Sequence, residues 1–410
     1  MTAGIEAINA YGGRTYLDVR TLFEARGLDL SRFDNLMMLN KAVALPFEDP
    51  VTHAVNAAKP LIDRLSEAEK ARIELVITAS ESGLDFGKSM ATYVHDHLGL
   101  PRTCRLFEVK QACYAGTAAL QMAVGWVAAG LSPGAKALVI ATDVAGAAAR
   151  HTYAEPSQGS GAVAMLVGDR PEVLALDLGA SGYHSFEVMD TCRPQVNLET
   201  GDPDLSLMSY LDCLEHSFAA YTAKVEGADF QETFGYLAFH TPFAGMVKGA
   251  HRMMMRKFKK VRPADSERDF EQRLAPSLAY GSQVGNLYSA ALYLALCSLI
   301  DHADFSRPQR IGLFSYGSGC SSEFFSGVVS PEGQQRVREM RMAQALSSRQ
   351  ALSMDEFERI LDGCDEWGFG VQNQVMDRTP YRRLYEQQFE GRGLLVLTGV
   401  SHYHREYAWS

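Results

Sequence analysis

The stretch Glu108-Val109-Lys110-Gln111-Ala112-Cys113-Tyr114-Ala115-Gly116-Thr117-Ala118-Ala119-Leu120 decides the fold class of this chain. An extended apolar stretch leads into Cys113, and an Ala- and Gly-rich helix with almost no charge is expected from Tyr114 to Leu131. A helix that is apolar on every side belongs inside a large protein. The positive end of the helix dipole and the free N–H groups of a first turn favour thiolate, the nucleophilic form of cysteine. The stretch therefore predicts a nucleophile at the mouth of a site; the alternative is a small buried apolar side chain.

Three other segments each place one polar group at the end of an expected element. Strand-like residues 73–78 precede Glu81, strand-like residues 236–239 precede His240, and Asn286 opens an apolar helix. Sites of α/β proteins usually lie at such ends. A cysteine can accept an acyl group, His and Asn can hold a thioester carbonyl, and a carboxylate can move protons, so the set suits acyl-thioester chemistry. Simpler alternatives are an acidic helix start for Glu81, a core histidine, and a helix-capping Asn286.

The composition is that of a soluble enzyme. The chain has 410 residues, of which 47% are hydrophobic and 21% charged, and its formal net charge is −10. This length allows two domains or one large duplicated unit, and the acidic charge argues against a nucleic-acid partner. No apolar run approaches the roughly 20 residues that cross a bilayer, and residues 1–6 lack the features of a signal peptide. Seven cysteines without a CxxC pair or zinc spacing favour a reducing cytoplasm.

Five motifs, in the right order, resemble the site segments of the 3-hydroxy-3-methylglutaryl-CoA (HMG-CoA) synthases of the thiolase superfamily. They are the Cys113 stretch and residues 78–82, 239–243, 285–288 and 314–319. Four further segments resemble, more closely, the synthase homologues of polyketide β-branching cassettes: residues 31–38, 187–194, 205–212 and 404–407. One departure is the segment 144–154, which is shorter than in those cassette enzymes and puts the mouth of the site in doubt.

The resemblance implies an α/β protein with a thiolase-like, duplicated, five-layer αβαβα fold. The N-terminal half would span 1–170 and carry Glu81 and Cys113; the C-terminal half would span 171–410 and carry His240 and Asn286. Insertions are expected near 183–233, as irregular, turn-rich chain over the site, and near 328–390, as charged peripheral helices. A faint repeat between residues 117–123 and 289–295 agrees with a duplicated unit, although two Ala/Leu helices can be alike by chance.

The same resemblance implies a mechanism without a metal or redox cofactor. Cys113 would take an acetyl group from a thioester, and Glu81 would remove a proton from the acetyl methyl group. The carbanion would attack the β-keto carbon of a second thioester that His240 and Asn286 position, and water would release the product. Backbone N–H groups of Cys113 and of the turn 316–318 would form the oxyanion hole.

Five more residues are expected to contact substrate: Tyr316, Ser318, Asp143, Tyr183 and Phe186. Each has a structural alternative: turn formation for Ser318, capping for Asp143, and core packing for the two aromatic side chains. The basic run 251–262 stands out in an acidic protein. Arg256 in this run and Arg32 are the expected contacts for acidic carrier proteins, although such runs are more often solvated helix faces.

Four functions compete. The first is a carrier-protein-dependent HMG synthase whose partners are donor and acceptor acyl carrier proteins of a polyketide synthase; a homodimer is expected from the superfamily. The second is an HMG-CoA synthase of the mevalonate route, which uses acetyl-CoA and acetoacetyl-CoA. Such enzymes usually carry a lysine, suited to a CoA phosphate, near the position of Gly245. A decarboxylating ketosynthase would not need Glu81, and a non-catalytic acyl-binding subunit would not need all four polar groups.

Overall fold

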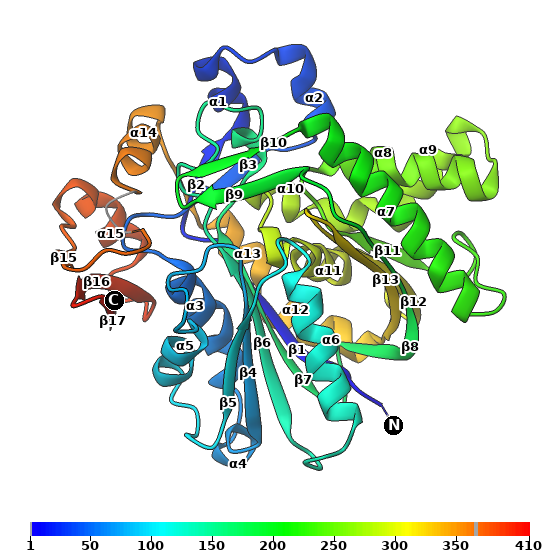
Figure 1. Ribbon diagram of the computed structural model, residues 1–410, viewed down its shortest axis with the longest axis horizontal. Coiled ribbons are helices and arrows are strands. Elements are labelled where there is room, and N and C mark those ends of the chain that lie inside the picture. Colours follow the sequence, from blue (N-terminus) through cyan, green and yellow to red (C-terminus); the bar gives the residue numbers. More distant parts are fainter. Residues whose placement is uncertain (1, 365–367) are drawn as a thin grey trace.

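The computed structural model describes residues 2–364 and 368–410 (Figure 1). Its N-terminal half contains a sheet with the strand order β1-β7-β6-β4-β5. These strands are β1 (Gly4–Tyr11), β4 (Ile73–Ala79), β5 (Arg105–Val109), β6 (Lys136–Asp143) and β7 (Gly161–Gly168). β4 runs parallel to β5 and β6, whereas β7 runs antiparallel to β1 and β6. Their near-continuous apolar sequences fit a sheet that is covered on both faces.

The second half continues the same sheet with the order β11-β12-β13-β8. These strands are β8 (Leu174–Ser185), β11 (Tyr236–Phe239), β12 (Gln309–Gly317) and β13 (Ser321–Val329). The two parts meet where β8 pairs with the start of β1, at Gly4 with Ala175 and Ile5 with Leu174. The expected boundary at residue 170 therefore falls between β7 and β8.

Two apolar helices, α6 (Ala115–Ala128) and α11 (Ala291–His302), pack against each other in the middle of the molecule. The Thr117 and Tyr293 hydroxyls are 2.8 Å apart. A Cβ atom at Gly116 would lie 2.3 Å from the Ser289 carbonyl oxygen, so only glycine permits this approach.

Further helices cover the two outer faces (Figure 1). α3 (Pro50–Ile62) and α5 (Ala91–His97) pack on the N-terminal strands, and α7 (Pro203–Lys224) and α8 (Ala244–Met254) pack on the C-terminal strands. The result is the expected five-layer αβαβα arrangement, with helices, strands, helices, strands and helices in order.

Smaller elements surround these layers. The remaining strands are β2 (Thr15–Asp18), β3 (Asn40–Val43), β9 (Thr191–Gln195), β10 (Leu198–Gly201), β14 (Gln350–Ala351), β15 (Gln374–Val375), β16 (Leu395–Ser401) and β17 (His404–Trp409). The remaining helices are α1 (Val19–Arg26), α2 (Phe33–Leu36), α4 (Glu67–Lys70), α9 (Pro263–Arg273), α10 (Gly281–Val284), α12 (Pro331–Glu339), α13 (Met342–Ser347), α14 (Met354–Gly363) and α15 (Arg382–Gln388). A π-helical turn, η3 (Met255–Lys259), prolongs α8. Among the helices described, none is long and apolar enough to cross a membrane.

One expectation about a single element is wrong. The helix after Cys113 was expected to be buried on every side, yet Met122 in α6 is 52% exposed in the described part of the chain. The segment 183–233, expected to contain irregular, turn-rich stretches, also contains the β9–β10 hairpin and the 22 residues of α7. Asp202 caps this helix by accepting the N–H groups of Asp204 and Leu205.

Candidate active site

Cys113 and Glu81 meet at one edge of the sheet. β4 and β5 are parallel neighbours, with Ala79 opposite Val109, so the residues that follow them emerge at the same edge. Glu81 lies two residues beyond β4, and Cys113 lies between β5 and α6. Both side chains are partly exposed. The Cys113 thiol donates a hydrogen bond to Oε1 of Glu81 at 3.3 Å, so two of the residues predicted from the sequence are in direct contact.

The turn that carries Cys113 is strained and tightly packed. Ala112 has a φ of +44°, in the left-handed region that non-glycine residues rarely adopt and that often marks active sites. On the other side, a Cβ atom at Gly317 would lie 2.5 Å from the Tyr114 nitrogen and 2.6 Å from the Gln111 oxygen. Only a glycine lets the end of β12 reach this turn.

Glu323 of β13 fixes the first turns of α6. The Tyr114 hydroxyl donates to it at 2.8 Å and the Gln121 amide at 2.7 Å. Because Glu323 is buried, both of these hydrogen bonds are shielded from water. The helix that follows Cys113 is therefore attached to the C-terminal half of the sheet.

The resting state of Cys113 is the thiol, and the expectation of a thiolate is wrong. α6 begins at Ala115, so Cys113 precedes the first helical turn. Burial is the largest effect that raises the pKa of the Cys113 thiol, and the charge of Glu81 is the next. Burial, followed by the charge of Asp143, also raises the pKa of Glu81. The environment therefore favours the thiol form of Cys113, with the Glu81 carboxyl group as its hydrogen-bond partner.

Asp143 lies beneath the pair and is fully buried. One of its oxygens accepts the N–H groups of Glu81 at 2.9 Å and Ser82 at 3.0 Å, and the other accepts the N–H of Ser289 at 3.0 Å. The hydroxyls of Ser80, Ser82 and Ser289 donate to the same carboxylate. Protein donors thus occupy both oxygens, and in this geometry Asp143 fixes the turn that carries Glu81.

His240 follows β11 and is only 2% exposed. Its backbone N–H donates to the Phe314 oxygen, and its carbonyl accepts the Tyr210 hydroxyl, both at 2.8 Å. Burial lowers the pKa of His240 to about 3, so its ring is neutral at physiological pH. Within the described part of the chain, Nδ1 of this ring is buried without a hydrogen-bond partner. A neutral imidazole can donate one hydrogen bond and accept another.

Asn286 both caps the following turn and retains donors. Its Oδ1 accepts the Tyr288 N–H at 2.8 Å. This is the capping interaction that the sequence offered as the alternative role of Asn286. Its backbone pairs with the 157–159 segment, donating to the Ser157 oxygen and accepting from the Gly159 N–H. With Oδ1 engaged, the side-chain NH₂ group can donate to a thioester carbonyl.

The remaining predicted residues lie around the loop between β12 and β13. Tyr316 is buried and donates to Asp190, which also accepts the Gly319 N–H at 2.9 Å. Ser318 is partly exposed in this loop. The Cys320 N–H donates to the Phe186 oxygen at 2.8 Å, which places Phe186 beside the loop. Tyr183 is 58% exposed and lies under Nζ of Lys224, 4.2 Å from the centre of its ring.

Two residues of the β9–β10 hairpin complete the site and were not singled out from the sequence. Arg193 donates to the Ala145 oxygen at 2.8 Å and to the Ser82 hydroxyl at 3.2 Å. Its positive charge opposes burial by lowering the pKa of Glu81. Glu199 accepts hydrogen bonds from Gln158 at 2.6 Å and from the Tyr288 hydroxyl at 3.2 Å.

The sequence carried a signal for only one of these two residues, Arg193. Arg193 falls in the segment 187–194 that carried the closer family resemblance. No local pattern predicted that the hairpin folds back over residue 82.

The residues expected to bind carrier proteins lie on the surface. The side chain of Arg32 is 66% exposed, 3.7 Å from Asp29. Arg256 is exposed in the π-helical turn after α8 and has no ion pair within the described residues. The basic run is only partly solvated, since His251 is fully buried and contacts Asp269 at 2.7 Å.

Comparison with known proteins identifies the class. The family models for the N-terminal and C-terminal parts of hydroxymethylglutaryl-coenzyme A synthase match residues 54–172 and 254–379. The fold and the Cys–Glu–His–Asn site thus define a thiolase-fold enzyme that forms carbon–carbon bonds by acyl transfer. The chain belongs to the hydroxymethylglutaryl-CoA synthase family.

Its relatives include enzymes of two pathways. The chain is 56% identical, over 100% of its length and 99% of the relative, to the polyketide biosynthesis 3-hydroxy-3-methylglutaryl-ACP synthase PksG of Bacillus subtilis. It is 35% identical, over 88% of its length and 91% of the relative, to the hydroxymethylglutaryl-CoA synthase of Enterococcus faecalis. The crystal structure of the curacin biosynthetic pathway HMG synthase in complex with holo donor-ACP matches with a TM-score of 0.98 and 54% identity, over 100% of both chains.

Proposed function

We propose that the protein is a 3-hydroxy-3-methylglutaryl-ACP synthase-like enzyme of polyketide β-branching. It takes an acetyl group from a carrier-protein thioester onto Cys113 and adds the acetyl carbanion to the β-keto carbon of a carrier-bound polyketide. It then hydrolyses the Cys113 thioester, which leaves a β-branch. The observation that carries the chemistry is the 3.3 Å contact between the Cys113 thiol and the Glu81 carboxylate.

Acetyl transfer begins when Glu81 accepts the thiol proton. Sγ of Cys113 then attacks the acetyl carbonyl carbon, and the N–H groups at Cys113 and residues 316–318 hold the oxyanion. The carbonyl re-forms as the bond to the carrier's sulfur breaks, and the departing thiolate takes the proton from Glu81. Glu81 is then a carboxylate again and can act in the next step.

Condensation uses the same carboxylate. Glu81 removes a proton from the methyl group of acetyl-Cys113, and the resulting carbanion attacks the β-keto carbon of the second substrate. The new alkoxide takes the proton back from Glu81. His240 is neutral and Asn286 has NH₂ donors, so both can hold the second thioester carbonyl without an added charge.

A close packing contact favours carrier proteins over free CoA. A Cβ atom at Gly245 would lie 1.7 Å from the Asn35 carbonyl oxygen. The segment 31–38 therefore occupies the space that a side chain would need at Gly245, and a CoA-binding lysine has no room there. The same segment presents Arg32 on the surface, and α8 leads into Arg256. Acidic donor and acceptor carrier proteins would bind these two arginines by charge attraction.

The proposal includes a cytoplasmic homodimer. β5 is the edge strand of the nine-stranded sheet, and the α6 face that contains Met122 is exposed. An open edge beside an apolar helix face suits pairing with a second copy. Seven cysteines without a CxxC pair or zinc spacing support a reducing compartment.

The test measures acetylation and condensation separately, because Glu81 accepts a proton in both. Acetyl-carrier protein should add one acetyl group to Cys113, and Cys113→Ser should lose this adduct in mass spectrometry of the intact protein. Glu81→Gln should slow condensation with a β-ketoacyl-carrier protein by about 10²-fold or more, as loss of a general base commonly does. Wild-type preference for acetyl-CoA and acetoacetyl-CoA over carrier-bound substrates would instead identify an HMG-CoA synthase of the mevalonate route.

A further inference from the structure

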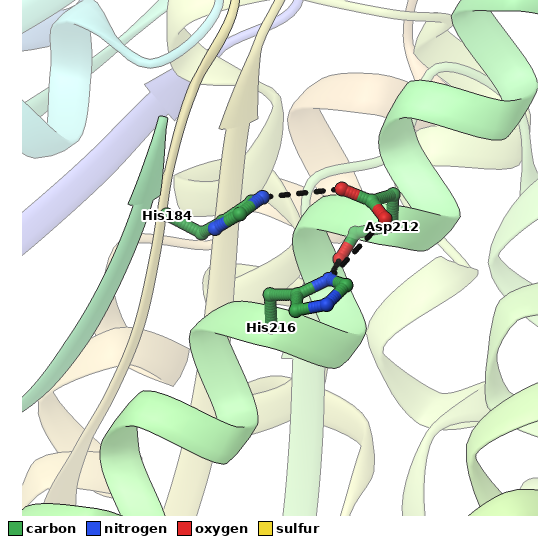
Figure 2. A group of neighbouring side chains, drawn as sticks. All are labelled: His184, Asp212 and His216. Carbon is green, nitrogen blue, oxygen red and sulfur yellow. Dashed lines mark hydrogen bonds and ion pairs between the residues drawn. The ribbon is translucent and has the colours of Figure 1, made fainter. Parts of the chain in front are cut away.

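Two histidines and one carboxylate converge on the outer side of the C-terminal half (Figure 2). His184 lies near the end of β8, and Asp212 and His216 lie four residues apart on α7, so both face the same side of the helix. Nε2 of His184 is 3.1 Å from Oδ2 of Asp212, and Nδ1 of His216 is 3.2 Å from Oδ1. One ligand atom from each residue lies within 4.8 Å of the others.

We propose that His184, Asp212 and His216 form a binding site for a divalent transition-metal ion, with Zn²⁺ as the best-fitting ion. Imidazole nitrogens and a carboxylate oxygen are ordinary zinc ligands. At metal–ligand bonds of about 2.0–2.2 Å, neighbouring ligands of a tetrahedral ion are about 3.3 Å apart. Each histidine nitrogen already lies at about this distance from an Asp212 oxygen, 3.1 Å from Oδ2 for His184 and 3.2 Å from Oδ1 for His216, so rotation of the carboxylate would bring one oxygen toward both. Ca²⁺ and Mg²⁺ fit poorly because they prefer oxygen ligands.

The side chains can reach the ion with small rotations. The imidazole rings of His184 and His216 stack with centroids 4.7 Å apart and planes inclined by 22°. The side chains are 30%, 45% and 49% exposed for His184, Asp212 and His216, so water can enter and complete the coordination. Three protein ligands with water in the fourth position is a common zinc arrangement.

Binding must break a local contact of His216. Nδ1 of His216 lies 2.9 Å from the Asp212 carbonyl oxygen, a contact in which the ring nitrogen carries the hydrogen. A metal needs the lone pair of this nitrogen, so the hydrogen moves to Nε2 of the same ring as the bond forms.

The ion would connect α7 to β8. On its buried side, α7 carries Tyr210, whose hydroxyl donates to the His240 oxygen, and Cys213, whose Sγ lies 3.4 Å from Sγ of Cys320. The ion would therefore stabilise the helix that packs behind His240. No substrate step requires it, so the expected consequence is higher stability rather than new chemistry.

The test uses the full chain with Cys113→Ser, which removes the partly exposed site thiol as a competing ligand. After chelation and dialysis, the protein is titrated with Zn²⁺ by calorimetry and with Co²⁺ by visible spectroscopy. We expect one equivalent of bound metal in calorimetry, a Co²⁺ absorption band that saturates at the same ratio, and a higher melting temperature. His184→Ala, His216→Ala and Asp212→Asn should each abolish all three effects. His402→Ala, at an exposed histidine of the β16–β17 turn, should preserve them.

Three results would overturn the proposal. In the first, the Cys113→Ser parent protein does not bind the metal. In the second, the parent and all three ligand variants bind the metal equally. In the third, His402→Ala loses metal binding as fully as the ligand variants do. The second would show adventitious binding elsewhere. Melting temperatures without metal report the folding of each variant, and Asp212→Asn, which is nearly isosteric, decides the matter if an alanine variant unfolds.

Discussion

At the scale of single residues, the site holds two acids whose ionised forms are both disfavoured. Burial raises the pKa values of both groups, the charge of Glu81 further raises that of Cys113, and the charge of Asp143 further raises that of Glu81. A thiolate beside a carboxylate is therefore an unfavourable state. In the proposed mechanism, the nucleophile therefore forms as the Cys113 proton moves to Glu81, when substrate is present to receive the new bond. The same carboxylate is then available for the second proton transfer, the removal of a proton from the methyl group of acetyl-Cys113. One residue can therefore serve both half-reactions.

The raised pKa of Glu81 has a consequence for stability. The folded pKa lies above that of the unfolded chain, so the unfolded state ionises first as pH rises. The favourable contribution of protonated Glu81 is complete below the unfolded pKa and is lost progressively up to the folded pKa. Glu81→Gln should therefore be more stable than wild type at pH 8, by at least about 1 kcal/mol, the equivalent of one pKa unit.

Chemical unfolding at pH 8 and pH 4.5 measures this difference. The advantage of Glu81→Gln should shrink at pH 4.5, where Glu81 is protonated in the folded wild type. An equal difference at both pH values would show that the substitution acts through packing rather than charge.

At the scale of elements, the β9–β10 hairpin sets the charge balance of the site. Arg193 is the positive group that lowers the pKa of Glu81. Arg193→Gln should therefore move the pH dependence of Cys113 acetylation to higher pH, because Glu81 would ionise less readily. Arg193→Lys should restore part of the shift. Quenched-flow mass spectrometry from pH 6 to 9 would measure it, and a uniform loss of rate at every pH would contradict the electrostatic role.

The contact between α2 and α8 gives a second prediction at this scale. Gly245→Ala places a methyl group 1.7 Å from the Asn35 oxygen, so one segment must move. A cost of about 1–3 kcal/mol in the free energy of unfolding is expected. Gly249→Ala, one turn further along α8, has nothing within 4 Å of its added Cβ. It should be neutral or stabilising by up to about 1 kcal/mol. Equal effects in urea unfolding would show that the contact is unimportant.

How far the sequence predicts each element depends on how local its cause is. The strands before Glu81 and His240, and the apolar helix after Cys113, follow from nearby residues and lie where expected. The position of Arg193 over Ser82 does not follow from nearby residues, because it depends on a hydrogen bond between residues 111 positions apart. The thiolate expectation was wrong for the same reason. The helix dipole is a local cause, whereas the opposing Glu81 comes from another strand.

At the scale of the whole molecule, net charge opposes the proposed partnership. The protein has a formal charge of −10 and would repel an acidic carrier protein at long range. A local positive surface must overcome this repulsion. α2 and α8 lie at the same end of the molecule (Figure 1). Arg32 precedes α2, and Arg256 follows the C-terminal end of α8.

Charge reversal at Arg256 tests that surface. Arg256→Glu puts a like charge against the carrier, which can cost several kcal/mol. Turnover of carrier-bound substrates by the variant should fall sharply. Its rate should also depend less on salt than the wild-type rate does, because salt screens surface charges over about 10 Å at 0.1 M and the variant has lost the attraction that salt weakens. Turnover of a pantetheine thioester should stay near wild type, since no protein surface is engaged. Arg307→Glu, at an exposed position before β12, changes net charge equally and is the matched control. If Arg256→Glu slows both substrates alike, or Arg307→Glu has the same effect, Arg256 does not bind the carrier and the docking surface lies elsewhere.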